Sequence, residues 1–443
     1  MSSQIDSFVD KLGDIVTDDS YLAVVMEDLL EPVIPGGSVR PATYAGNRNQ
    51  KGKNFAGSDE VFIPTAAESG WHSEFVRDEA GVPRLGKAVI IDSIQSQANR
   101  AEEMMWAHRK EVGGLPGVLL VTDLLNPDVE KAITEGIMKT VGKEPKLTPE
   151  QETFIRLAVN DELTSQIVST WTASHRHADA YFRFSEIDNL IQDVDTSRDA
   201  SVAYSNFINS IIFGFWNSYA ATRRTKQPRI YTSEITGFGG REVVSGAVKV
   251  DPVPIGIFEV PDDLNSPKRG ITLVKKGEAK IGDKDKKAPS AIGLGMIPAA
   301  VQPVGFWFEV ILRQGSISLN LIRRIKFAED TELRQRNAAG TVIVALALWG
   351  HQLASRDFAL RSGCELIVVN SLIGLRRHGT RELEQLSVDS IDLAAVVIEA
   401  IRRAELVGLH FDPEITTNLD TSFVKAIASG VLTQWRQGDT DEG

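Results

Sequence analysis

The sequence is almost without cysteine, since Cys364 is the only one among 443 residues. No disulfide can form within the chain, and a zinc site built on several cysteine thiolates is excluded. Long hydrophobic runs are also lacking, because the longest, Val342 to Trp349, is far too short to span a bilayer. The N-terminal segment is acidic and lacks the apolar stretch that a secretory signal needs. We therefore expect a cytoplasmic protein with no membrane attachment.

A net positive charge is lacking too. The chain carries 60 acidic residues against 48 Lys and Arg, a net charge of −12, which by itself argues against nucleic-acid binding. The total hides an asymmetry, because the N-terminal segment and the tail after Glu384 are acidic whereas residues 40–53, 223–229 and 268–287 are basic. Separated charge of this kind can place a cationic groove and an anionic patch on one molecule. Solvated lysine-rich loops are the alternative interpretation.

The composition is that of a folded globular protein, with 42% hydrophobic and 24% charged residues. The length suggests one elaborated core or two cores. Predicted strands cover residues 21–34, 87–92, 118–124, 228–240 and the start of 304–327; predicted helices follow Ser93 and cover 128–141, 148–169, 201–219, 333–353 and 384–408. This order, with long insertions, no internal repeat and no regular βαβ pattern, predicts an α+β fold with mixed strand pairing.

Two motifs that suggest enzyme chemistry are incomplete. Gly81 to Ala88 nearly matches a phosphate-binding P-loop, but Ala88 stands where a Ser or Thr hydroxyl must hold magnesium, and a strand follows instead of a helix. Ser174 to Tyr181 offers two histidines and an aspartate, yet a metal site needs three or four convergent donors and the other histidines are scattered. We therefore expect no cofactor, no metal and no catalytic residue, and favour structural or RNA-contacting roles for the two histidines.

Two other segments have the composition of a phosphate-binding surface. Asp92 to Arg100 places Gln and Asn in the first turns of a helix that follows a buried strand. Helix N-termini attract phosphate, and amide side chains can contact phosphates or sugar hydroxyls without selecting a base. Lys284 to Pro298 joins a lysine cluster to Gly293 and Gly295, where a backbone can approach a ligand closely. A helix with a polar outer face and an ordinary turn are the alternatives.

An ordered set of segments resembles a known family. The set consists of residues 92–100 (DSIQSQANR), 174–180 (SHRHADA), 232–235 (TSEI), 292–298 (IGLGMIP) and 360–366 (LRSGCEL). It is similar to the backbone subunit of the type I-G (formerly I-U) CRISPR effector complex, or Cascade, a member of the Cas-seven group in the RAMP superfamily. The resemblance extends over most of residues 20–370.

The resemblance implies an RRM-like (ferredoxin-like) palm with large inserted finger and thumb elements. It divides the chain into a discontinuous palm (1–35, 86–125 and 300–410), a basic loop insertion (36–85), helical finger and lysine-rich thumb-type insertions (126–299) and an acidic C-terminal extension (411–443). It implies several copies stacked head to tail along a CRISPR guide RNA, which they present to a target DNA strand in antiviral defence. Other Cascade subunits and a recruited helicase–nuclease would be further partners. The chain itself would be no enzyme, because cutting belongs to that helicase–nuclease.

Basic side chains, neutral polar donors and glycines in these segments are the predicted RNA contacts. They are Arg40, Arg48, Lys51, Lys53, Gln95, Asn99, Arg100, His175, Arg176, Arg223, Arg224, Lys284, Lys286, Lys287, Gly293 and Gly295. Two other functions remain open: a metal-dependent target-RNA ribonuclease of the type III backbone kind, and an assembly protein that forms tubes or sheets without RNA.

Overall fold

The protein is described by a computed structural model. The described residues are 2–42, 44–45, 61–62, 65–70, 85–141, 147–164, 168–219, 224–245, 257–259, 272–274, 286–287, 302–328, 333–388 and 390–441. The chain divides into two compact units, of which the first comprises 1–121, 167–243 and 304–419, and the second 122–166, 244–303 and 420–443. Helices are combined with strands that pair antiparallel in all but one of the described pairings, so the predicted α+β class is confirmed. No helix in the described ranges has both the length and the apolar character to cross a membrane.

An eight-stranded sheet forms the centre of the first unit. Its strands follow the order β17-β18-β1-β16-β10-β5-β4, and β19 also pairs with β18. All these pairings are antiparallel. The strands are β1 (Tyr21–Pro32), β4 (Thr65–Gly70), β5 (Leu85–Asp92), β10 (Tyr231–Phe238), β16 (Val310–Ser318), β17 (Ala359–Arg361), β18 (Cys364–Arg377) and β19 (Leu383–Gln385). The predicted strands at 21–34, 87–92 and 228–240 are confirmed. β4 and β10 belong to the sheet, although the family resemblance places their segments in the insertions 36–85 and 126–299.

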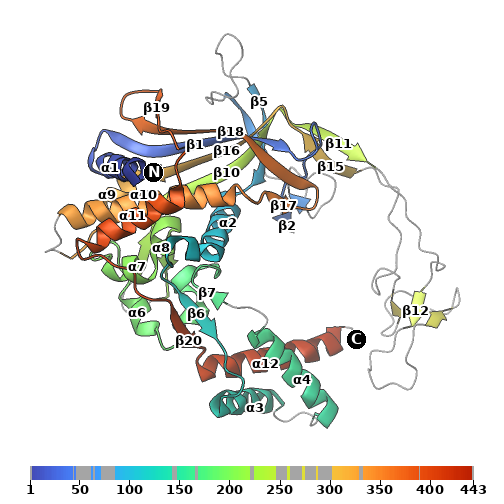
Figure 1. Ribbon diagram of the computed structural model, residues 1–443. Helices are drawn as coiled ribbons and strands as arrows, with labels where there is room; N and C mark the ends of the chain where they lie inside the picture. Colours follow the sequence, from blue (N-terminus) through green and yellow to red (C-terminus); the bar gives the residue numbers. More distant parts are fainter. Residues whose placement is uncertain are drawn as a thin grey trace. The chain divides into compact units, whose positions relative to one another are not determined.

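Helices cover one face of this sheet. They are α1 (Ser2–Thr17), α2 (Ile94–Ala107), α9 (Leu319–Arg323), α10 (Leu333–Ala354) and α11 (Leu393–Glu405). Figure 1 shows α2, α10 and α11 side by side below the strands. α10 is buried on all sides from Ala339 to His351, as its run of apolar residues predicts. The helix predicted at 384–408 is shorter than expected. Residues 383–385 form a strand that pairs with β18, and the helix begins only at Leu393, with Asp392 as its N-cap.

Short elements complete the first unit. They are η2 (Arg109–Val112), η3 (Arg176–Ala178), α5 (Ala180–Arg183), α6 (Asp188–Gln192), α7 (Ser201–Asn206), α8 (Ile208–Phe213), β2 (Tyr44–Ala45), β3 (Val61–Phe62), β6 (Val118–Val121), β7 (Val168–Ser169), β8 (Phe215–Asn217), β9 (Thr225–Gln227) and β20 (Ile415–Asn418). β11 (Arg241–Ser245) and β15 (Gln302–Trp307) pair where the unit boundaries fall. The prediction of one helix over 201–219 is wrong. The backbone leaves the helical region at Phe207, and Gly214 at φ +79° ends α8, so that β8 can pair with β9.

The second unit contains three longer helices, α3 (Pro127–Val141), α4 (Pro149–Thr164) and α12 (Thr421–Asp441), with short strands β12 (Ile257–Glu259), β13 (Thr272–Val274) and β14 (Lys286–Lys287). α12 packs on α3 so closely at Gly136 that a Cβ there would lie 2.5 Å from the Lys425 carbonyl oxygen. The predicted start of α4 is confirmed. Thr148 accepts from the Gln151 N–H at 3.3 Å, and the Gln151 side chain accepts from the Thr148 N–H at 2.9 Å, which together form a capping box.

Candidate nucleic-acid interface

A buried carboxylate, Asp92, organises the point where β5 ends and α2 begins. Ser93 caps the helix with its side chain, which accepts from the Ser96 N–H at 3.4 Å. Asp92 is 2% exposed and accepts from Gln97 Nε2 at 2.7 Å, Arg100 Nε at 3.3 Å and Arg361 Nη2 at 2.9 Å. Because an unpaired buried charge is costly, these partners stabilise the carboxylate, and the N-terminal end of the helix adds a favourable dipole.

The two arginines on Asp92 keep part of their surface in solvent. The side chains of Arg100 and Arg361 are 24% and 25% exposed. Each is held a second time, since Arg100 Nη2 donates to the Leu360 carbonyl at 2.9 Å and Arg361 Nη1 donates to the Arg40 carbonyl at 3.2 Å. Arg40 is exposed and lies at the turn of the β17–β18 hairpin. Two guanidinium groups therefore bind one carboxylate and are oriented before any ligand arrives, which lowers the entropic cost of binding; the exposed Arg40 adjoins them through its backbone.

Two amide side chains on α2 lie on the exposed face of the same helix start. Gln95 and Asn99 are four residues apart and both exposed, whereas Gln97 between them is buried. The helical period explains this division, because residues i and i+4 share a face. One turn further along α2 the exposed residue is an acid, Glu103, so the row of amide side chains ends at Asn99. The Asp92 patch is defined as Arg40, Gln95, Asn99, Arg100 and Arg361. Such cations and amides are the side chains that contact phosphates and sugar hydroxyls without reading a base.

Four of the five segments that carry the family resemblance meet around α2. Ile235, in segment 232–235, lies opposite Asp92 in the β10–β5 pair. The apolar residues of segment 360–366 pack with Ile91 and Ile235 in one core cluster. Segment 174–180 reaches α2 through an ion pair to Glu102. The fifth segment, 292–298, lies outside the described residues.

That ion pair requires a correction to the predicted contacts. Arg176 is 7% exposed, and its guanidinium donates to Glu102 at 2.7 and 2.5 Å and to the Gly214 carbonyl at 2.9 Å. Asn209 donates to the same carboxylate at 3.1 Å. The Arg176 backbone is left-handed, with φ +55°, which is uncommon for a residue other than glycine. Because the guanidinium is committed to a buried acid, Arg176 links segments of the core and is not placed to touch RNA.

The other predicted contacts lie elsewhere or are not described. His175 is exposed just before η3, and Arg224 is exposed just before β9. Lys286 and Lys287 form β14, which pairs with β12. The residues outside the described ranges, which stay predictions, are Arg48, Lys51, Lys53, Arg223, Lys284, Gly293 and Gly295. From the predicted set, the structure thus places Arg40 and Arg100 in the network around Asp92, and Gln95 and Asn99 on the exposed face of the first turns of α2.

Sequence reasoning missed Arg361 as a member of this patch. Its segment carried the resemblance, but nothing within residues 360–366 distinguishes this arginine from a solvated one. Its position depends on Asp92, which is 269 residues away in the chain. A link of that length leaves no local pattern.

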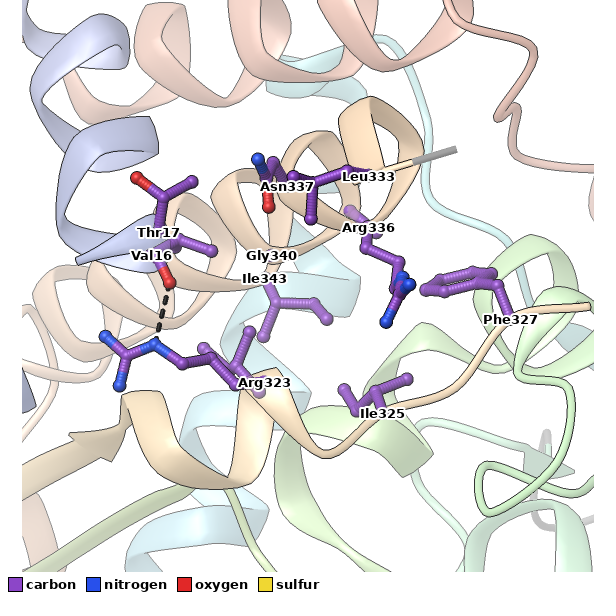
Figure 2. A pocket seen from close by; sticks show the side chains of 12 residues that line it. Val16, Thr17, Arg323, Ile325, Phe327, Leu333, Arg336, Asn337, Gly340 and Ile343 are labelled. Carbon is purple, nitrogen blue, oxygen red and sulfur yellow. Dashed lines mark hydrogen bonds between the residues drawn. The ribbon is translucent and has the colours of Figure 1, made fainter. Parts of the chain in front are cut away.

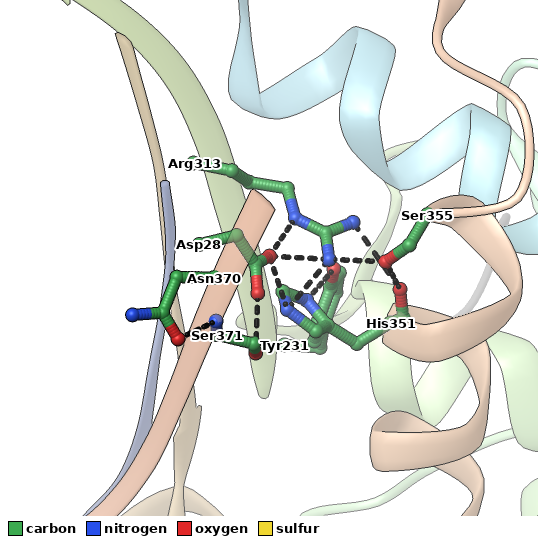
Figure 3. Close-up of polar contacts among 7 residues, drawn as sticks. All are labelled: Asp28, Tyr231, Arg313, His351, Ser355, Asn370 and Ser371. Atoms are coloured by element: carbon green, nitrogen blue, oxygen red, sulfur yellow. Dashed lines mark hydrogen bonds and ion pairs between the residues drawn. The ribbon is translucent and has the colours of Figure 1, made fainter. Parts of the chain in front are cut away.

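A second polar cluster crosses the sheet and joins it to α10 (Figure 3). Asp28 lies opposite Arg313 on β16 and opposite Ser371 on β18. Its carboxylate accepts from Arg313 Nε at 2.5 Å and from Ser371 Oγ at 2.6 Å, and lies 3.0 Å from His351 Nε2. Burial raises the pKa of Asp28, but the neighbouring His351 and Arg313 outweigh it and hold the pKa well below its usual range.

This cluster contains serine, histidine and aspartate but not in the order of a hydrolytic triad. In a triad the imidazole lies between the serine hydroxyl and the carboxylate. Here the carboxylate lies between Ser371 and His351, and the other imidazole nitrogen lies 3.0 Å from the Tyr231 hydroxyl. The serine therefore contacts no imidazole, and the arrangement is that of a structural network around the buried Asp28 carboxylate.

A small cavity near the end of α1 also has a structural explanation (Figure 2). Its volume is about 210 Å³, and most of its lining surface is apolar. Arg323, at its edge, donates to the carbonyls of Ile15 at 3.0 Å, Val16 at 2.8 Å and Asp18 at 2.6 Å, and so caps the C-terminal end of α1. Within the described ranges, no three His, Cys, Asp or Glu side chains gather as metal ligands do.

Residues 24–242 match the family model described as CRISPR-associated protein GSU0053 (Cas_GSU0053). The matched region runs from β1 into β11 and includes Asp92, α2 and the Arg176–Glu102 pair, whereas Arg361 lies beyond it. A search of curated proteins found no significant match.

Proposed function

We propose that this chain is a CRISPR-associated, non-enzymatic subunit that binds a CRISPR guide RNA along its sugar–phosphate backbone. In this proposal it is one of several copies in an effector complex of the type I-G kind, and the guide is presented to a target DNA strand. The family match supports the CRISPR context. The observation that carries the RNA-binding role is the Asp92 patch, where two partly exposed guanidinium groups are held on one carboxylate and two exposed amides lie on the first turns of the same helix.

The chemistry of the Asp92 patch suits a guide of variable sequence. Such an RNA must be held through phosphates and 2′-hydroxyls, so that its base edges remain free to pair with the target. Arg100 and Arg361 can donate to phosphate oxygens, and Gln95 and Asn99 to phosphates or hydroxyls. The net charge of −12 on the whole chain would restrain binding to other nucleic acids.

The architecture proposed for the complex is a head-to-tail stack. Such a stack needs a heterologous interface, in which one face of a copy docks on a different face of the next. Acidic and basic segments of the chain could set the polarity of that interface. The antiparallel sheet with helices over one face supports an RRM-like palm as the repeating body. Other Cascade subunits and a helicase–nuclease are the further partners proposed.

The experiment is co-expression with a CRISPR array, followed by purification and extraction of bound nucleic acid. We expect RNA of a defined length and assemblies larger than a monomer. A protein that emerges as an RNA-free monomer would contradict the proposal, and RNA-free tubes or sheets would favour a purely structural assembly protein. Incubation of the loaded protein with complementary RNA and magnesium tests the non-enzymatic part. Periodic cuts would favour the ribonuclease alternative.

A further inference from the structure

The β8–β9 hairpin carries two large aromatic side chains that face solvent, Trp216 on β8 and Tyr219 two residues after β8 ends. Trp216 is 70% exposed and Tyr219 is 72% exposed. The region is also free of acids, since no Asp or Glu occurs between Asp199 and Glu234 in a chain whose net charge is −12. Four cations lie in the same stretch: Arg223, Arg224, Lys226 and Arg229. Exposed aromatic rings beside cations are the combination that binds single-stranded nucleic acid.

The hairpin has one face in the core and the other in solvent. Trp216 pairs directly with Lys226 across the two strands, and both side chains are exposed. Their neighbours Phe215, Asn217 and Gln227 are buried, as the alternation of a strand requires. The ring of Phe215 packs edge-on against the ring of His177, with 4.6 Å between the ring centres, and this contact anchors the buried face of the hairpin. The hairpin thus presents an aromatic ring and an ammonium group side by side on a supported base.

A second ring, that of Tyr219, follows three residues after Trp216 and is paired with a cation from α5. The Arg183 guanidinium, at the end of α5, lies 5.0 Å from the ring centre of Tyr219 and 6.0 Å from that of Phe184. Phe184 is itself 42% exposed. The cation orders the tyrosine side chain and leaves much of its surface in solvent.

We propose that these side chains stack the unpaired bases of single-stranded nucleic acid; the platform is defined as Arg183, Trp216, Tyr219 and Lys226. Aromatic faces bind any base by stacking, and adjacent cations bind the phosphates between the bases. The absence of Asp and Glu from residues 200–233, together with the cations of that stretch, favours a polyanion over a protein partner; the nearest acids along the chain flank Arg183, at Asp179 and Glu186. The inference rests on the proposed function for the source of the strand, which is either the guide RNA or a single strand of target DNA.

The test measures binding of short, mixed-sequence single strands, in RNA and DNA form, to the purified full chain. Abasic strands of the same length are compared with them. We expect Trp216→Ala and Tyr219→Ala each to weaken binding of normal strands by about five- to a hundredfold. Abasic strands should bind wild type and variants equally, because they have no base to stack. Trp216→Phe should retain most of the affinity, and Trp307→Ala, at another exposed tryptophan (53%), should change nothing.

A second measurement does not depend on how well the variants fold. A single strand that carries 5-iodouridine is cross-linked to the wild-type protein by light, and the modified residue is identified by mass spectrometry. Attachment at Trp216 or Tyr219 supports the platform. Attachment only at other residues, or equal weakening of normal and abasic strands in Trp216→Ala, overturns it.

The outcomes also separate this inference from the proposed function. If guide RNA copurifies with the protein but Trp216→Ala binds normal strands as wild type does, the platform is wrong and the function stands. If no RNA copurifies, yet base-dependent binding is lost in Trp216→Ala, the platform stands and the guide-binding function is wrong. Tighter binding of the RNA form assigns the platform to the guide, and tighter binding of the DNA form assigns it to the target.

Discussion

Arg361 donates to Asp92 across 2.9 Å, although the two residues are 269 positions apart in the chain. This ion pair joins the β17–β18 hairpin to the start of α2. The same carboxylate also holds Arg100 and Gln97. The geometry of the Asp92 patch therefore depends on one buried acid, which gives the first prediction.

Asp92→Asn should destabilise the protein and disorder the two arginines. The change keeps the shape of the side chain but removes the charge that both guanidinium groups bind. We expect the free energy of unfolding to fall by about 2 to 3 kcal/mol, less than for a fully buried pair because the arginines are partly solvated. Chemical denaturation measures the loss. Glu365→Gln, an exposed acid on the neighbouring strand, is the control and should stay within about 0.5 kcal/mol of wild type.

The double variant Gln95→Glu with Asn99→Asp tests the patch without disturbing Asp92. Both positions are exposed, so the near-isosteric changes should leave stability unaltered. Two added negative charges should weaken RNA binding to a similar extent at every sequence and make the affinity less dependent on salt. Titrations at several salt concentrations measure this, with Gln352→Glu on α10 as the matched control. A loss confined to particular sequences would mean that these amides read bases.

The basic loop gives a separate prediction about the path of the RNA. Lys51 and Lys53 lie outside the described residues, in the first basic stretch of the sequence. Lys51→Glu with Lys53→Glu should weaken binding of any RNA and flatten its salt dependence, if the loop contacts phosphates. The same salt titration measures it. An unchanged slope would remove the loop from the RNA path.

Elements with strong local signals were predictable from the sequence. At the start of α4, Thr148 caps a free backbone N–H group of the helix, so the signal lies within a few residues of sequence. The helix α10 is apolar enough to be recognised from its composition alone. The prediction of one helix over residues 201–219 is wrong because the structure there depends on a partner strand outside the segment. Its apolar and aromatic residues suit a buried helix, but β8 forms only because β9 supplies a partner strand.

The only residues of the candidate site that could be predicted from the sequence are those whose side-chain exposure follows the period of the helix. Gln95 and Asn99 share a face of α2 by spacing alone, and that face is exposed. Arg176 and Arg361 could not be placed from their neighbours. Their environments are decided by Glu102, 74 residues away, and by Asp92, 269 residues away. Side chains whose partners lie that far along the chain take their roles from the tertiary fold.

His177 provides a prediction about pH. The imidazole is fully buried, with Nδ1 2.7 Å from Ser210 Oγ and the ring stacked on Phe207 at 5.0 Å. Burial and the adjacent Arg176 charge lower the pKa of His177 to about 3. An unfolded histidine has a pKa of about 6.5. Between these two values the unfolded chain binds a proton that the folded chain does not, so the folded state loses stability as pH falls through that range.

His177→Gln should remove this contribution to the pH dependence. The wild-type free energy of unfolding should decrease by up to about 1.4 kcal/mol for each pH unit below about 6.5 because of His177, and the variant should lack that slope. A second buried histidine, His351, also has a lowered pKa, so part of the dependence should remain. Denaturation at a series of pH values measures the slope, with the exposed His378→Gln as control. Equal slopes in wild type and His177→Gln would mean that the folded imidazole accepts its proton at an ordinary pH.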